Sequence, residues 1–228
     1  MSGRMISQNM RAALAALLLS FCILFAVSGT ALAQDGLIAA AERGETLVVR
    51  RLLAEGVGVN IRDGRGRTAL LAATQRNHVD VARLLINEGA DVNAKDFVQD
   101  TPFLVAGADG RAEILKLMLV AEPDLKSVNR FGGTALIPAC HRGHVEAVKL
   151  LLTTAIDKDH VNHLGLTALM EAVVLGDGGP KHTEIVRLLV AAGTNVNVPD
   201  RDGVTPLGHA RQRGYADMVR ILEAAGAK

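Results

Sequence analysis

Two pairs of histidines, with members three positions apart, are the residues in this sequence that most closely match metal-binding chemistry. The pairs are His141 with His144 and His160 with His163. Imidazole nitrogens bind zinc or copper, but a zinc site needs three or four ligands. His144 also occupies a position that His78 and His182 fill in other copies of a repeated segment. That recurrence favours a turn residue over a metal ligand, so we expect neither a metal nor another cofactor.

Other chemistry-bearing residues are isolated or lie in predicted turns. The carboxylate pairs Asp157/Asp159 and Asp200/Asp202 fall in hairpins, where solvated side chains are expected. Cys140 follows the apolar positions of a predicted helix, which favours burial over nucleophilic chemistry. The glycine-rich run 176–181 lacks the spacing of a phosphate-binding loop, and no G-x-S-x-G or H-E-x-x-H motif occurs. We predict a non-catalytic protein; the alternative is a metal-handling protein or an enzyme that uses the histidines.

Residues 1–33 have the pattern of a secretory signal peptide. Arg4 and Arg11 form a positive start without acidic residues, 12–27 are an apolar run, and 28–33 end in an A-x-A site. We expect cleavage after Ala33, export to the periplasm, and a mature chain of residues 34–228. The alternative is an uncleaved N-terminal membrane anchor, although the small residues at its end have no role in a spanning helix.

Composition excludes several kinds of partner. Without the two leader arginines, 23 basic residues face 24 acidic ones, so bulk charge does not drive binding to nucleic acid or anionic membranes. The absence of Trp and the single Tyr also argue against a stacking platform for single-stranded nucleic acid. Cys140 is the one cysteine after the leader, so no intramolecular disulfide forms. We expect a monomer held by packing alone, without a nucleic-acid partner and without membrane insertion of the mature chain.

The elements that position these residues come from an internal repeat. Residues 66–96, GRTALLAATQRNHVDVARLLINEGADVNAKD, predict a short helix opened by Thr68, a second helix over about 79–88 and a glycine-closed turn. Threonine recurs at an interval of 33 at Thr101, Thr134 and Thr167, and again at Thr205 after 38. A unit repeated at such spacing indicates a solenoid.

The segments T-A-L-L-x-A, N-H-x-D-V and L-L-I-x-x-G-A-D-V-N resemble the ankyrin repeat. The resemblance covers essentially everything after residue 34 and implies an all-α solenoid of helix-turn-helix units joined by short β-hairpin loops. It divides one domain into about six repeats, at about 35–63, 63–95, 96–128, 129–161, 162–199 and 200–228. It also implies a protein-binding scaffold or adaptor. Some exported bacterial proteins of this kind are associated with oxidative-stress defence, and the alternative is an effector secreted further, toward a host protein.

The copies depart from the family pattern at several positions. Gln99 and Glu122 replace turn glycines, and Ala155 stands where a left-handed glycine is expected, which predicts strain on the order of 1 kcal/mol. No later copy keeps the histidine of the family's T-P-L-H pattern, so we expect apolar packing instead of a Thr–His hydrogen bond. Five extra residues, 177–181, lengthen repeat five. They are either a tolerated turn extension or part of a binding face.

The resemblance places a concave surface at the hairpin tips and the exposed side of the first helices. Charged positions on this surface are Arg65, Arg67, Arg76, Arg142 and Arg213. The middle carries an apolar strip, with His163 within it, that consists of Phe97, Val98, Phe131, Leu164, Leu166, Val174 and Leu175. We predict that Phe97, Phe131 and Leu164 anchor an unidentified protein partner while the arginines orient its acidic groups. The alternative is that the apolar residues stack on adjacent hairpins and stay largely buried.

Overall fold

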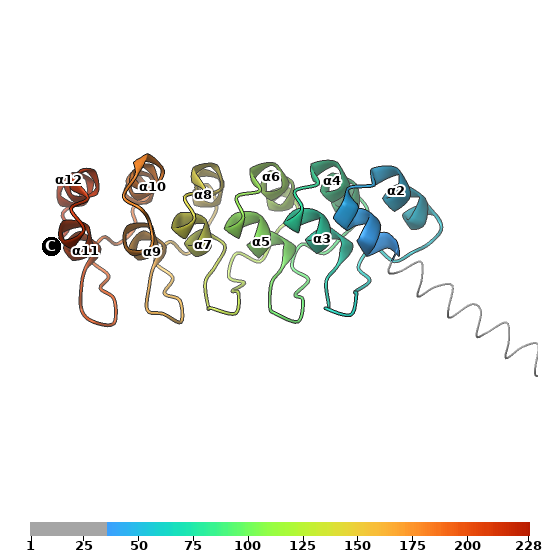
Figure 1. Cartoon of the computed structure of the whole chain (residues 1–228), viewed down its shortest axis with the longest axis horizontal. Helices are drawn as coiled ribbons and strands as arrows, with labels where there is room; N and C mark the ends of the chain where they lie inside the picture. The colour runs from blue at the N-terminus through green and yellow to red at the C-terminus, as the bar shows by residue number, and fades with distance from the viewer. Residues whose placement is uncertain (1–35) are drawn as a thin grey trace, which may run out of the picture.

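The computed structural model describes residues 36–228, and the predicted signal peptide with its cleavage site lies outside the described residues. Figure 1 shows two rows of helices along an elongated molecule, with loops projecting beside one row. The inner helices, which lie next to the loops, are α3 (Ala69–Gln75), α5 (Pro102–Ala108), α7 (Leu136–His141), α9 (Ala168–Val174) and α11 (Pro206–Gln212). The outer helices are α2 (Thr46–Ala54), α4 (Val79–Asn87), α6 (Ala112–Val120), α8 (Val145–Leu152), α10 (Pro180–Ala191) and α12 (Ala216–Ala224). A further helix over 36–43 precedes α2. The predicted solenoid of about six helix pairs is confirmed.

The recurring threonines start four of the inner helices. In α3 the Thr68 hydroxyl accepts a hydrogen bond from the Leu71 N–H at 3.2 Å, and Thr101 accepts one from Leu104 at 3.0 Å in α5. Thr167 and Thr205 cap α9 and α11 in the same way. Each cap satisfies a backbone donor that a helix leaves unpaired in its first turn.

Thr134 does not cap its helix, contrary to the prediction. Its hydroxyl is buried and has no hydrogen-bond partner among the described residues, and α7 begins only at Leu136. In the other repeats the fourth residue after the threonine donates its N–H to the threonine carbonyl, as Ala72 does to Thr68 at 3.0 Å. Pro138 occupies that position in repeat four and has no N–H to donate. The first turn therefore loses the bond that would hold the threonine in place.

The loops are tight hairpins rather than strand pairs. Each is closed by a backbone bond across its tip, such as Asp63 N–H to Arg67 O at 3.0 Å and Asn162 N–H to Leu166 O at 3.0 Å. Neighbouring hairpins are joined at some positions, as where the His163 N–H donates to the Phe131 carbonyl at 2.9 Å. These bonds are too few to form a strand within residues 36–228.

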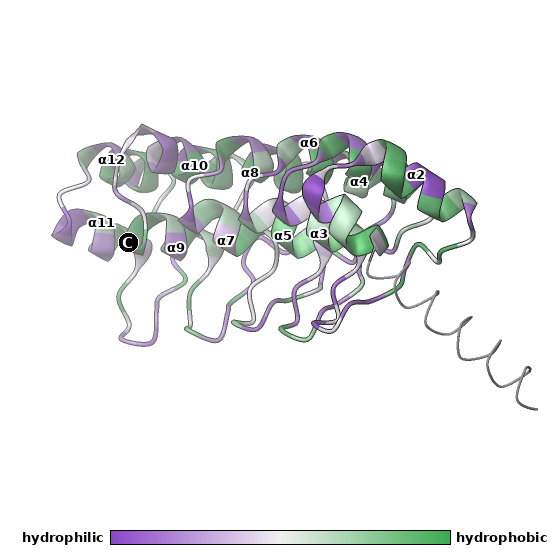
Figure 2. Ribbon diagram, turned by 45° about the vertical axis from the view of Figure 1, so that its right-hand side comes forward, coloured by the Kyte–Doolittle hydropathy of each residue, from purple (hydrophilic) through white to green (hydrophobic). Residues whose placement is uncertain are grey.

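One apolar core runs the length of the array between the two helix rows. Figure 2 shows hydrophobic residues along both rows and largely hydrophilic loops. Small residues on the inner helices let neighbouring repeats approach closely: Ala72, Ala106, Ala139 and Ala172 have no exposed surface. Phe103 is the largest of the fully buried side chains. Because each helix pair buries its apolar face only against its neighbours, the stability of every repeat depends on the adjacent ones.

The turns after the outer helices use left-handed backbone at most positions. Gly89 and Glu122 occupy equivalent places in repeats two and three, with φ of 82° and 51°, and Gln99 keeps the hairpin turn at 69°. The left-handed conformation predicted for Ala155 is wrong, because Ala155 is not among the residues with positive φ. Instead, the Thr154 hydroxyl accepts the Ile156 N–H at 3.2 Å and closes a different turn. The predicted strain is therefore absent at Ala155.

The five additional residues of repeat five form a turn that lengthens α10. Asp177 begins the turn and its carboxylate lies 2.7 Å from Nδ1 of His182, while Pro180 starts the helix. Tyr215 of the next repeat donates its hydroxyl to the Gly176 carbonyl at 3.3 Å. The insertion is thus held to its own repeat through His182, and the residue just before it is bonded to the next repeat.

Candidate functional site

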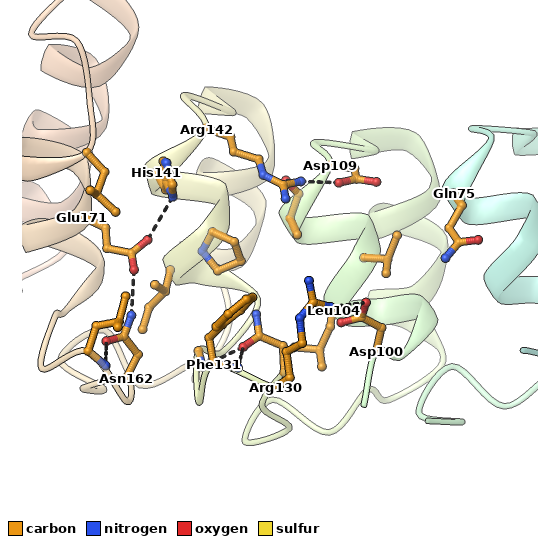
Figure 3. Close-up of a pocket in the computed structure, with 18 residues that line it drawn as sticks. Gln75, Asp100, Leu104, Asp109, Arg130, Phe131, His141, Arg142, Asn162 and Glu171 are labelled. Carbon is orange, nitrogen blue, oxygen red and sulfur yellow. Dashed lines mark hydrogen bonds and ion pairs between the residues drawn. The ribbon is translucent and has the colours of Figure 1, made fainter. Parts of the chain in front are cut away.

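A groove of about 380 Å³ opens on the loop side of the inner helices, between repeats three and five. Its walls come from α5, α7 and α9 and from the hairpins that precede these helices, and Gln75 of α3 also lines it. Figure 3 shows the side chains that line it, with Glu171 between His141 and Asn162 on one side and Arg130 beside Asp100 on the other. The groove therefore combines apolar walls with carboxylates and cationic groups.

Glu171 is a buried carboxylate in this groove. It lies in the middle of α9 with 5% of its surface exposed, and Asn162 of the adjoining hairpin donates an amide hydrogen to Oε1 at 2.7 Å. Burial raises the pKa of Glu171 to about 7, although the hydrogen bond from Asn162 acts to lower it. The carboxyl therefore titrates much closer to neutral pH than an exposed glutamate does.

His141 lies beside Glu171 but does not neutralise it. Its Nδ1 is 3.5 Å from Oε2 of Glu171, beyond the usual hydrogen-bond distance. Burial, together with the positive charge of Arg142, lowers the pKa of His141 below its ordinary value. The pair is therefore a neutral imidazole near a carboxyl rather than a salt bridge at neutral pH.

Much of the apolar strip is exposed. Phe131, Leu164 and Leu175 line the groove and keep 53%, 55% and 42% of their surface accessible. Phe97 and Val98 lie one hairpin earlier and are also exposed. Leu166 and Val174 are half-buried. The strip thus has an exposed part on both sides of the hairpin that carries Phe131.

Part of the strip also rests on neighbouring hairpins, as the stacking alternative expected. A β-carbon added to Gly66 would lie 2.7 Å from the Phe97 ring, and one added to Gly132 would lie 2.5 Å from the exposed His163 ring. Phe97 nevertheless remains 74% exposed. Stacking holds these rings in place without removing them from solvent.

Two of the predicted arginines share one carboxylate at the first end of the array. Arg67 contacts Asp63 at 2.8 Å and Glu42 at 3.2 Å, and Arg76 contacts the other oxygen of Glu42 at 2.9 Å. Hydrogen bonds from Arg76 and Arg67 lower the pKa of Glu42. With only 13% of its side chain exposed, Arg67 ties its hairpin to the preceding repeat rather than offering free donors.

Arginines at the groove are also paired. Arg142 forms an ion pair with Asp109, and Arg130 lies 3.6 Å from Asp100 while its guanidinium covers the Phe131 ring at 4.7 Å from the centroid. Burial and the neighbouring Asp96 raise the pKa of Asp100. Within residues 36–228, two predicted positions have no carboxylate at ion-pair distance: Arg65 and Arg213.

The recurring histidine position joins successive repeats. His78 donates to the Glu42 carbonyl at 3.0 Å, and His182 donates to the His141 carbonyl at 2.9 Å. Arg111 makes the equivalent bond to Gln75 at 3.1 Å. In repeat four, His144 occupies this position, but the bond to the preceding repeat is made by Arg142, which donates to the Ala108 carbonyl at 3.0 Å. This recurrence explains these residues by packing between repeats.

The remaining candidates for chemistry also have structural surroundings. His160 donates to the Gly132 carbonyl at 2.7 Å, and the described residues contain no group of three histidine, cysteine or acidic side chains placed to hold a metal ion. Cys140 is fully buried, and burial raises the pKa of its thiol well above the ordinary value. Among the helices of residues 36–228, none has the length and apolar character needed to cross a membrane.

Family models for ankyrin repeats match most of the sequence. The model for ankyrin repeats in three copies matches residues 8–96 and 103–200, and the model for ankyrin repeats in many copies matches 180–223. The chain belongs to the ankyrin-repeat family. Ankyrin repeats are protein-interaction modules that are typically non-catalytic.

Solved ankyrin-repeat structures resemble this one over most of its length. An ankyrin repeat domain from Acinetobacter baumannii AYE is 49% identical, with a TM-score of 0.82 over 84% of this chain and 98% of the other. The ankyrin repeat protein EF0377 is 41% identical, with a TM-score of 0.80 over 83% and 97%. The ankyrin repeat domain of Bcl-3, an IkappaB-family member, is 30% identical, with a TM-score of 0.75 over 85% and 86%.

A shorter match is found to the ankyrin repeat protein YahD of Escherichia coli (strain K12). It is 47% identical over 57 residues, which are 25% of this chain and 28% of that protein. The matched segment therefore spans less than a third of the relative's length.

Glu171 and Asn162, a buried hydrogen-bonded pair in this ankyrin groove, are not among the site residues predicted from the sequence. Glu171 is the fourth residue after its threonine, where repeats two to four carry Ala72, Val105 and Pro138 and repeat six carries His209. A glutamate at an inner-helix position that is apolar in repeats two to four is the signal that identifies this residue. Arg67, Arg76 and Arg142 are predicted from their charge and surface position alone, and each contacts a carboxylate of the preceding repeat.

Proposed function

We propose that this ankyrin-repeat chain is a non-catalytic scaffold or adaptor that acts in the periplasm and binds a protein partner through its apolar strip. The observation that carries the proposal is the exposure of Phe131, Leu164 and Leu175 around a groove of about 380 Å³. Clustered apolar side chains that stay in water, rimmed by polar groups, are typical of protein interaction sites.

The test begins by identifying the partner through cross-linking in intact cells and mass spectrometry. Phe131→Asp with Leu164→Asp then places two charges in the strip and should abolish co-purification of that partner. Both side chains are more than half exposed, so thermal stability should change little.

A matched control uses exposed apolar residues outside the strip. Leu47 and Val120 lie on outer helices and are 81% and 86% exposed. Replacing both with Asp adds the same charge, and partner binding should persist. If the strip variant keeps its partner, or if the control loses it equally, the proposed surface is wrong.

Export is tested separately by fractionation and by the intact mass of the purified product. The proposal requires a periplasmic chain that begins at Gln34 after cleavage behind Ala33. A membrane-bound chain that retains residues 1–33 favours the anchor, whereas accumulation in the medium favours the secreted effector. The link to oxidative-stress defence rests on the family resemblance alone and requires that a deletion strain lose survival under peroxide.

A further inference from the structure

Glu171 differs from the other carboxylates of the groove in lacking a cationic partner within residues 36–228. Asp100 faces Arg130 at 3.6 Å and Asp109 pairs with Arg142. The buried Glu171 has only the amide of Asn162 and the neutral imidazole beside it. A buried carboxylate without an opposite charge is costly to ionise, and a cation arriving from outside would offset that cost.

We propose that the groove binds a polypeptide segment in which an arginine or lysine, flanked by apolar residues, places its cationic group on Glu171. This inference rests on the proposed function and specifies the chemistry of the partner. Phe131, Leu164 and Leu175 form the exposed apolar walls of the same groove, which fit the flanking residues. The rim arginines are paired with carboxylates, which reduces their repulsion of an incoming cation.

The proposal reverses the charge first expected of the partner. Arg67, Arg76 and Arg142 all contact carboxylates of this chain, so they offer less to acidic groups than their sequence positions suggest. Glu171, by contrast, is the groove carboxylate for which the described chain supplies no cation. Charge complementarity therefore favours a basic anchor over an acidic one.

A cationic anchor makes affinity depend on pH in a defined direction. The cation binds the ionised carboxylate, so binding below the pKa of Glu171 requires release of a proton and weakens about tenfold per pH unit. The elements packed against α9 bring the following titratable groups to this region: His141 and Cys140 on α7, His182 on α10 and His209 on α11. His182 and His209 lie against carboxylates of their own repeats, at 2.7 Å and 2.6 Å. Protonation of His141 at acid pH would add repulsion and reinforce the same trend.

The test uses three acetylated and amidated peptides, Gly-Leu-X-Leu-Gly, in which X is Arg, Gln or Glu. Each is titrated into the purified chain at pH 8.0 and pH 5.5, and amide chemical shifts report binding. At pH 8.0 the Arg peptide should bind at least tenfold more tightly than the Gln peptide and should shift the amides around residues 131, 164 and 171. At pH 5.5 this preference should shrink to within about threefold.

Glu171→Gln should remove the preference for Arg at both pH values, whereas Glu146→Gln, on an exposed face of α8, should preserve it. Circular dichroism checks that each variant is folded. If Glu171→Gln does not fold, the loss of the preference for the Arg peptide between pH 8.0 and pH 5.5 in the unaltered chain tests the proposal instead. Equal affinity for the Arg and Gln peptides at pH 8.0, or no binding of any peptide, overturns the cationic anchor. The strip variant and its cellular partner test the proposed function independently of this result.

Discussion

Replacing Glu171 with glutamine isolates the cost of a buried negative charge in the groove. Glutamine has nearly the same shape, and its side-chain oxygen can still accept the 2.7 Å hydrogen bond from Asn162. It cannot ionise. The difference in unfolding free energy between the two chains therefore measures mainly what ionisation of a side chain that is 7% exposed costs the folded state.

The size and sign of that cost follow from the pKa of Glu171. Burial raises this pKa from 4.5 to about 7, so between these values the folded chain binds a proton more tightly than the unfolded chain. The contribution of Glu171 to stability is therefore fully present below about pH 4.5, falls as pH rises, and is lost above about pH 7. At 1.36 kcal/mol per pH unit, Glu171→Gln should be more stable than the unaltered chain by up to about 3 kcal/mol at pH 8.5. At pH 5.0 the difference should shrink to about 1 kcal/mol or less.

Urea unfolding followed by far-ultraviolet circular dichroism measures both differences, provided that the slopes with urea agree. Glu146→Gln is the matched control, because its carboxylate is 71% exposed and its removal should produce no comparable dependence on pH. A Glu171→Gln chain that is less stable at pH 8.5, or whose advantage is the same at both pH values, would refute the assignment of Glu171 as a costly buried charge.

Three further predictions concern the array as a whole. Arg67→Met should lower the unfolding free energy by about 1–2 kcal/mol in urea titrations, because it leaves the partly buried carboxylate of Asp63 without a cation. Arg43→Met removes an exposed pair and should cost far less. Glu122→Gly should raise the unfolding free energy by about 0.5–1 kcal/mol, because glycine adopts a φ of 51° without strain. Ala155→Gly, at the equivalent position without positive φ, should not raise it, and equal effects of the two substitutions would contradict the prediction. Cys140 should resist a thiol reagent in the native chain and react fully in denaturant, and rapid labelling of the native chain would disprove its burial.

The helix pairs could be predicted from the sequence because their signals are local. A threonine that caps the helix beginning one residue later is recognised over four positions, and α3, α5, α9 and α11 begin where this rule places them. The two local failures are also local in origin. Pro138 removes the donor that would have anchored Thr134, and the hydroxyl of Thr154 closes the turn that a left-handed Ala155 was expected to make.

The pairing of the arginines could not be predicted by the same means. Arg142 meets Asp109 across 33 positions, and Arg76 meets Glu42 across 34. These contacts depend on the rise from one repeat to the next. The sequence places the arginines on the right surface, but whether they are free there depends on which residue of the preceding repeat stands opposite.

The register that would have identified Glu171 is visible when the last two repeats are compared. In repeats five and six, the side chain of the first hairpin residue is hydrogen-bonded to the inner-helix side chain nine positions later. Asn162 bonds to Glu171 at 2.7 Å, and Asp200 bonds to His209 at 2.6 Å. Ala72 is apolar at this inner position. A polar side chain placed there is enclosed by its own hairpin, so the identity of the hairpin residue determines whether a charge is balanced. His209 faces a carboxylate, whereas Glu171 faces only an amide, and that difference leaves an unbalanced carboxylate in a groove with exposed apolar walls.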